Sequence, residues 1–195
     1  MGYNEKRIIL ASASPRRREL LDRFGLNYEV IPARGEEAAL PGLTPGETVA
    51  ALARNKAMEV SARTGGGALV IAADTVVELD GELLGKPGTP EKAAEMLSRL
   101  SGAVNRVWSG VCVMEGERCL THSECTMVHF RPLTPGEIDA YVATGEPLDK
   151  AGGYGYQGLA SLFVERIEGD FFNVMGLPVC ALGLMLRSFG VELLK

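Results

Sequence analysis

Short apolar runs alternate along this chain with signals for the start of a helix, and this alternation sets the class of fold. Thr44-Pro45-Gly46-Glu47 is typical of a capping box, in which Thr and Glu side chains bond the free backbone N–H groups at a helix start. The segment 43–47 returns letter for letter at 133–137. Because the match ends there, it indicates two helix starts and not a duplicated domain.

The expected helices and strands follow from these apolar runs and helix-start signals. We expect helices at 15–24, 45–63, 90–100, 135–144 and about 178–189, and strands at 8–11, 28–32, 68–73, 75–79, 82–84, 105–115, 118–131 and 162–168. Asp80-Gly81 is a strong hairpin signal. Helices that alternate with strands, with hairpins among them, predict an α/β fold with a mixed, partly antiparallel sheet flanked by helices. The 195 residues suffice for one large domain or two lobes sharing a sheet, and we expect a single domain over 1–195.

Composition and charge argue against several classes of function. With 46% hydrophobic and 23% charged residues, the chain is typical of a folded soluble protein. No apolar run of about 18 residues occurs, so we expect no membrane span, and the first residues do not resemble a secretory signal. A net charge of −5 argues against broad nucleic-acid binding. The four cysteines form no CxxC pair, which favours reduced thiols in a cytoplasmic protein.

Three consecutive arginines, 16–18, fall just inside the expected helix 15–24, which Ser14 can cap and Pro15 can open. A first helical turn normally favours acidic residues, because the backbone N–H groups there carry partial positive charge. Guanidinium groups at this end are unfavourable unless an anion shares them. The segment therefore predicts a site for phosphate or carboxylate, and hence a phosphorylated substrate.

Lys56 and Asp74 are charged residues that adjoin apolar segments. Lys56 lies on the apolar stripe of the helix 45–63, so it either extends to solvent along that surface or reaches into a cleft. Asp74 follows the apolar run 70–73. A carboxylate at the carboxyl end of a central strand points to the crevice where α/β proteins bind ligands. The alternative is that Asp74 is a turn or capping residue.

Two loops carry further candidates for binding phosphate or metal. Glu36 and Glu37 are either a solvated pair or ligands of a divalent cation. Lys86, between Gly85 and Pro87, is either a turn lysine or a phosphate contact. This segment is not a P-loop, because the required spacing and hydroxyl are absent.

The segment 153–158 spells G-x-G-x-x-G. It is weak as a dinucleotide fingerprint, because no βαβ unit surrounds it. We interpret it as a tight loop whose glycines let a ligand approach closely, with Gln157 available for hydrogen bonds to the edge of a base.

Together these motifs resemble the Maf family of nucleoside triphosphate pyrophosphatases, also described as septum-formation inhibitors. The motifs occur in order over nearly the whole chain: Ser12-Ala-Ser14-Pro15-Arg16-Arg17, Glu36-Glu37, Leu52-Ala53-x-x-Lys56-Ala57, Ala73-Asp74-Thr75-Val76-Val77, Gly85-Lys86-Pro87, Glu146-Pro147-x-Asp149-Lys150-Ala151-Gly152-x-Tyr154-Gly155-x-Gln157-Gly158 and Asn173-Val-x-Gly176-Leu177-Pro178. The Asp74-Thr75 pair and the Gln157 loop match the branch that acts on dTTP and UTP. The branch that acts on 7-methyl-GTP has Asp-Gln at Asp74-Thr75 and lacks the loop.

The resemblance implies two lobes around a central cleft, as in ITPase-like proteins, and it assigns roles to individual residues. By this resemblance Asp74 is the catalytic acid/base, and Lys56 and Lys86 are catalytic groups that hold phosphate. The implied substrate-binding residues are Ser12, Arg16, Arg17, Thr75, Lys150 and Gln157, of which Arg16, Thr75 and Gln157 set base preference. Glu37 and Asp74 are the implied ligands of a divalent cation, Mg²⁺ or Mn²⁺. The resemblance also implies a homodimer.

The expected reaction is hydrolysis of dTTP and UTP to the monophosphate and pyrophosphate. A nucleoside triphosphate carries about four negative charges, which converging basic residues would neutralise. The expected partner is this substrate, with no nucleic acid and no membrane. Two alternatives remain: a non-catalytic nucleotide-binding regulator of cell division, and a pyrophosphatase acting on 7-methyl-GTP.

Overall fold

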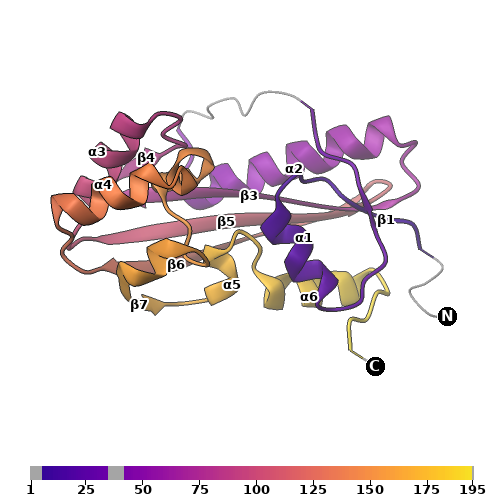
Figure 1. Ribbon diagram of the computed structural model, residues 1–195. Helices are drawn as coiled ribbons and strands as arrows, with labels where there is room; N and C mark the ends of the chain where they lie inside the picture. Colours follow the sequence, from indigo (N-terminus) through magenta and orange to yellow (C-terminus); the bar gives the residue numbers. More distant parts are fainter. Residues whose placement is uncertain (1–5, 35–41, 195) are drawn as a thin grey trace. The chain divides into compact units, whose positions relative to one another are not determined.

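The computed structural model describes residues 6–34 and 42–194. Its described strands form a mixed seven-stranded sheet in the order β2-β1-β3-β5-β6-β7, with β4 paired to β3 (Figure 1). The strands are β1 (Ile8–Leu10), β2 (Glu29–Val30), β3 (Leu69–Leu79), β4 (Glu82–Leu84), β5 (Val104–Glu115), β6 (Arg118–Phe130) and β7 (Val164–Glu168). The α-helices are α1 (Pro15–Asp22), α2 (Pro45–Arg63), α3 (Pro90–Leu100), α4 (Pro135–Ala143), α5 (Phe171–Val174) and α6 (Val179–Ser188). The 3₁₀ turns η2 (Glu146–Asp149), η3 (Ala151–Gly153) and η4 (Leu159–Leu162) lie between α4 and β7.

The chain divides into two compact units. Among the described residues, unit 1 contains 6–34, 42–74, 109–124 and 176–194, and unit 2 contains 75–108 and 125–175. The strands β3, β5 and β6 contribute residues to both units. The α/β class and the mixed sheet flanked by helices, both expected from the sequence, are confirmed.

The core of unit 1 is built on parallel strands. Ile9 of β1 lies opposite Val70 of β3 and, on its other side, opposite Glu29 of β2. All three residues of β1 are buried and apolar, which is typical of a parallel strand covered on both faces. Figure 1 shows α2 on one side of these strands and α6 on the other. The small buried side chains of α2 pack against Val70 and Ala72; they are Ala53, Ala57 and Val60.

Gly110 of β5 lets α2 approach the sheet closely. A Cβ atom at Gly110 would lie 2.2 Å from the carbonyl oxygen of Val49 and 2.6 Å from the backbone nitrogen of Ala50. No side chain larger than hydrogen fits at such distances. The backbone of α2 therefore rests directly on β5 at this point.

Unit 2 combines antiparallel strand pairs with an aromatic core. Asp80 and Gly81, with φ values of 52° and 84°, form the tight turn between β3 and β4, as their sequence predicts. The ring of Phe163 meets the ring of Tyr141 edge-on at 5.2 Å, and Phe130 meets Tyr154 in the same way at 4.9 Å. These contacts join α4 and the 3₁₀ turns to the sheet.

One strand boundary differs from expectation in a way that matters for the site. We expected Asp74 at the carboxyl end of a strand that stops at residue 73, but β3 continues through Asp74 to Leu79. The strand persists because Val77 and Leu79 pair with β4. A charged residue in the middle of a buried strand is costly unless it has a partner. The sequence pattern does not show that partner.

Smaller differences have local causes. The helix α5 was not expected; Asp170 caps it by accepting from the N–H of Phe172, a short motif without helical periodicity. β2 is shorter than the predicted 28–32, since both of its residues are exposed and little packing extends it. Ser14 precedes α1 as predicted, but its side chain makes no capping hydrogen bond.

Candidate active site

Lys56 of α2 and Asp74 of β3 form an ion pair within unit 1. The ammonium Nζ of Lys56 donates to Oδ1 of Asp74. Alternation along β3 explains the meeting, because Asp74 shares a face with Val70 and Ala72, the face against which α2 packs. The Asp74 side chain is only 6% exposed, and that of Lys56 is 20% exposed. Lys56 therefore reaches inward to a buried carboxylate, so the alternative that it simply extends to solvent is wrong.

A second group in unit 1 forms around Arg17. Its Nε donates to the carbonyl oxygen of Gly176 at 2.8 Å, and its Nη1 donates to Oγ of Ser12 at 3.1 Å. The same hydroxyl oxygen accepts from the N–H of Ser14 at 3.2 Å. The Ser12 side chain thus connects the loop before α1 to the first turn of that helix. Gly176 orients the guanidinium from the other end of the chain.

The first turn of α1 has the composition that the sequence predicts for it. It contains no acidic residue, and Pro15 opens the helix. Arg16 is half-buried and makes no hydrogen bond or ion pair to a described residue. Arg17 is held by Ser12 and Gly176. The two predicted guanidinium groups at this helix start are therefore in different states: Arg17 is fixed by Ser12 and Gly176, whereas Arg16 makes no such contact with a described residue.

In unit 2, the Lys86 loop lies against the start of the Gly-rich segment. The N–H of Gly152 donates to the carbonyl oxygen of Gly85 at 3.0 Å, and the N–H of Gly88 donates to Leu148 at 3.1 Å. Lys86 itself is exposed. Two loops that the sequence singled out separately are thus neighbours in the structure.

Lys150 and Gln157 occupy different environments in the same loop. The Nζ of Lys150 donates to the carbonyl oxygen of Glu146 at 2.6 Å and to the carboxylate of Asp149 at 2.9 Å, and its side chain is 15% exposed. Gln157 is exposed at the tip of a turn. Lys150 has a structural role in this loop, and its contact with phosphate stays a prediction. Thr75 follows Asp74 directly in β3 and is half-buried.

Among the described candidate site residues, Asp74 offers a carboxylate to a divalent cation. Mg²⁺ is usually bound through one or two carboxylates together with substrate phosphates and water. Asp74 supplies one buried carboxylate, whereas Glu36 and Glu37 lie outside the described residues. Residues 6–34 and 42–194 contain no cluster of three or more possible metal ligands. Asp74 therefore offers one carboxylate of the kind that Mg²⁺ uses together with substrate phosphates.

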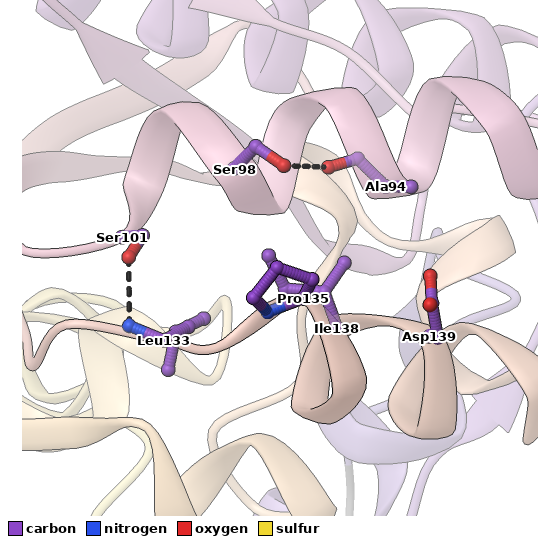
Figure 2. Close-up of a pocket in the computed structure, with 7 residues that line it drawn as sticks. All are labelled: Ala94, Ser98, Ser101, Leu133, Pro135, Ile138 and Asp139. Carbon is purple, nitrogen blue, oxygen red and sulfur yellow. Dashed lines mark hydrogen bonds between the residues drawn. The ribbon is translucent and has the colours of Figure 1, made fainter.

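A shallow cavity of about 220 Å³ lies elsewhere in unit 2, between α3 and α4. Figure 2 shows that the hydroxyl groups of two serines at this cavity form hydrogen bonds with backbone groups of the chain. Ser98 donates to the carbonyl oxygen of Ala94, and Ser101 accepts from the N–H of Leu133. None of the predicted site residues lines this cavity, and we assign it no part in the chemistry.

Comparison with known families places the chain in one of them. The family model described as Maf-like protein matches residues 7–189. This chain belongs to the Maf family, as the motifs in its sequence indicate.

Individual relatives make the likeness more specific. A protein of Moorella thermoacetica named dTTP/UTP pyrophosphatase is 51% identical over 189 residues, which cover 95% of this chain and 96% of that protein. A protein of Caldicellulosiruptor bescii with the same name is 45% identical over 195 residues, covering 97% of this chain and 98% of the relative. Among solved structures, the Staphylococcus aureus Ham1 protein matches with a TM-score of 0.52 and 15% identity, over 94% of this chain and 100% of that one. At this identity the structural likeness concerns the fold alone.

Three residues near the candidates received no role from the sequence. Gly176 holds Arg17 through its carbonyl oxygen, while Glu146 and Tyr141 hold the loop that carries Gln157. Gly176 and Glu146 belong to the motifs that carry the family resemblance. Gly176 acts through its backbone carbonyl oxygen, so its residue type does not reveal the contact. Tyr141 looks in the sequence like an ordinary core residue of a helix.

Proposed function

We propose that this chain hydrolyses dTTP and UTP to the nucleoside monophosphate and pyrophosphate. The observation that carries the proposal is the ion pair that the partly buried Lys56 makes with the buried carboxylate of Asp74. A buried ion pair contributes little net stability compared with well-packed apolar residues, so its presence points to chemistry. The names of the relatives supply the class of substrate.

In the proposed reaction Asp74 acts on the attacking water. Its carboxylate accepts a proton from the water as the oxygen forms a bond to the α-phosphorus. The bond from this phosphorus to the bridging oxygen breaks, and pyrophosphate leaves with that electron pair. The ammonium of Lys56 keeps the carboxylate oriented and supplies positive charge beside the reacting phosphate.

The other predicted residues bind the nucleotide in this proposal. They are Ser12, Arg16 and Arg17 in unit 1, and Thr75, Lys86, Lys150 and Gln157 in unit 2. The guanidinium and ammonium groups neutralise the phosphates, and Arg16, Thr75 and Gln157 select the base. The distinct states of the two arginines support different roles, in which the fixed Arg17 holds phosphate and Arg16 contributes to selection of the base.

The proposal includes a divalent cation, Mg²⁺ or Mn²⁺, held by Asp74 and Glu37. When bound, such a cation neutralises charge on the triphosphate. We also propose that the chain acts as a homodimer, as the family resemblance implies, and that it lies in the cytoplasm, as the pattern of its cysteines suggests. No described helix is long and apolar enough to cross a membrane.

A substrate panel tests the proposal. Pyrophosphate release is measured with dTTP, UTP, CTP, GTP and 7-methyl-GTP, each with Mg²⁺, with Mn²⁺ and with a chelator. The expected result is cation-dependent release from dTTP and UTP well above that from the other three. Nucleotide binding without turnover on any member would instead favour a regulator, and preference for 7-methyl-GTP would favour the other family branch.

A further inference from the structure

The turn that carries Gln157 is built on one carboxylate, that of Glu146. Residues 155–158 form a four-residue turn, closed by a hydrogen bond of 2.9 Å from the N–H of Gly158 to the carbonyl oxygen of Gly155. Oε1 of Glu146 accepts from the hydroxyl of Tyr141 at 2.9 Å, and Oε2 accepts from the N–H of Leu159 at 3.3 Å. The hydroxyl oxygen of Tyr141 accepts in turn from the N–H of Gly155 at 3.1 Å. Both ends of the turn are therefore tied to the same carboxylate.

The glycines of the turn are explained by this carboxylate. A Cβ atom at Gly158 would lie 2.2 Å from Oε1 of Glu146, and one at Gly155 would lie 3.2 Å from the same oxygen. Gly155 also lies against the stem of Lys150, whose Cε would be 2.8 Å from the added atom. The sequence suggested that these glycines admit a ligand. In the structure they admit Glu146 and Lys150.

Hydrogen bonds also anchor residues on the N-terminal side of the turn. Tyr154, just before the turn, is buried, and its hydroxyl donates to Oδ1 of Asn105 at 2.8 Å. Burial raises the pKa of this phenol, so it stays a neutral donor. The Nζ of Lys150 donates a hydrogen bond to the backbone carbonyl oxygen of Glu146. Within residues 155–158, Gln157 at the tip is the exposed one.

We propose that Glu146 is a positioning residue that, with Tyr141, fixes the turn so that the amide of Gln157 meets the edge of the base in one orientation. This rests on the proposed function, in which Gln157 contributes to base selection. A recognising amide must be held to within about 0.5 Å, because small misplacements lose most of the discrimination. Neither Glu146 nor Tyr141 touches substrate in this proposal; both act through Gln157.

Two variants test the proposal in the full-length chain. Glu146→Gln removes the charge and one acceptor, and Tyr141→Phe removes the bridging hydroxyl but keeps the ring against Phe163. For each we expect kcat/KM for dTTP to fall about tenfold, mainly through KM, with less than a twofold change for CTP. Glu95→Gln, an equal charge change on an exposed position of α3, is the control and should leave the dTTP-to-CTP ratio unchanged.

A double variant with Gln157→Ala tests whether Glu146 acts through Gln157. If Glu146 acts through Gln157, adding Glu146→Gln to Gln157→Ala should change the dTTP-to-CTP ratio less than twofold. An undiminished effect in that background, or an unchanged ratio in both single variants, would overturn the proposal.

Amide hydrogen exchange on the nucleotide-free protein separates this proposal from the proposed activity. The N–H groups of Gly155 and Leu159 should exchange at least tenfold faster in both variants than in the parent chain. Unchanged protection would refute the role of Glu146 even if the chain hydrolyses dTTP. If exchange is faster in the variants but the parent chain hydrolyses no nucleotide, then Glu146 does fix the turn and it is the proposed function that is refuted.

Discussion

Arg17 donates from Nε to the carbonyl oxygen of Gly176 at 2.8 Å, although 159 residues separate the two in the chain. The contact joins the first turn of α1 to the segment before α6, and Ser12 completes it on the other side of the guanidinium. Such a two-sided hold leaves the planar group little rotational freedom. A guanidinium fixed before substrate arrives loses less entropy when phosphate binds.

Replacing Arg17 by lysine should therefore reduce both stability and substrate binding. A lysine keeps the charge but lacks the two separate nitrogens, Nε and Nη1, with which the planar guanidinium meets Gly176 and Ser12. We expect the free energy of unfolding to fall by about 1–2 kcal/mol, and KM for dTTP to rise about tenfold. Urea denaturation and steady-state kinetics measure the two effects.

Arg18→Lys is the matched control for this change. Arg18 is the next residue of the same helix, and it is exposed. Its replacement should change neither quantity beyond error. Equal behaviour of the two variants would show that the hydrogen bonds of Arg17 carry no special weight.

Asp74→Asn should abolish turnover but not binding. The amide keeps the size of the side chain and loses the ability to accept a proton from water, so we expect kcat for dTTP to fall at least about a thousandfold. Nucleotide affinity, measured by calorimetry, should change much less. Turnover close to that of the parent chain would remove Asp74 from its proposed role.

Lys86→Gln tests whether unit 2 contributes to the same reaction. Loss of a charge-assisted contact to phosphate should raise KM for dTTP roughly tenfold or more, with the free energy of unfolding unchanged because Lys86 is exposed. Lys92→Gln, an exposed lysine of α3, is the control. The same KM in both variants would exclude Lys86 from substrate binding.

The sequence predicts most elements of the fold, because capping boxes and hairpin signals are local. Thr44 and Thr134 both form the boxes expected of them, each with the glutamate three residues later. The pairing of Lys56 with Asp74 could be stated only as alternatives. Whether a lysine on an apolar stripe finds a partner depends on which strand packs beneath it, and this is a long-range relationship.

The Gly-rich loop shows the other limit of the sequence. Its composition indicates a tight turn, and the structure has one. The same glycines serve equally well for a ligand or for a carboxylate of the chain itself, because glycine reports only that something lies close. That Glu146 is the neighbour follows from its contacts, with a Cβ at Gly158 only 2.2 Å from its oxygen.

The two capping boxes predict a difference in acid stability. The side chain of Arg131 donates to Glu137 and, with the Thr134 box, lowers the pKa of this carboxyl to about 2. The pKa of Glu47 is also lowered, by the hydroxyl and N–H of Thr44. A carboxyl with a lowered pKa in the folded chain stabilises it above the unfolded pKa of about 4.5 and loses that contribution as the pH falls towards 2.

Glu137→Gln should accordingly destabilise the protein at pH 7, and the difference from the parent chain should shrink as the pH falls from about 4.5 towards 2. Urea denaturation across this range measures it. Glu47→Gln, in the same Thr-Pro-Gly-Glu context without the arginine, should show a smaller loss at pH 7. A difference that is independent of pH would contradict the assignment.

Gly110→Ala should be among the most damaging single changes in unit 1. The added methyl group would lie 2.2 Å from the carbonyl oxygen of Val49, an atom of helix backbone that cannot rotate away. Relief requires α2 to move off the sheet, and overpacking of this kind costs about 3 kcal/mol. Because Lys56 lies on α2, the same shift should weaken its contact with Asp74 and lower kcat.

Gly136→Ala is the opposite control: nothing lies within 4 Å of the new Cβ, and alanine in the first turn of α4 should stabilise the protein by about 0.5 kcal/mol. Urea denaturation of the two variants should give changes of opposite sign, and a neutral Gly110→Ala would mean that α2 does not rest on β5 as described.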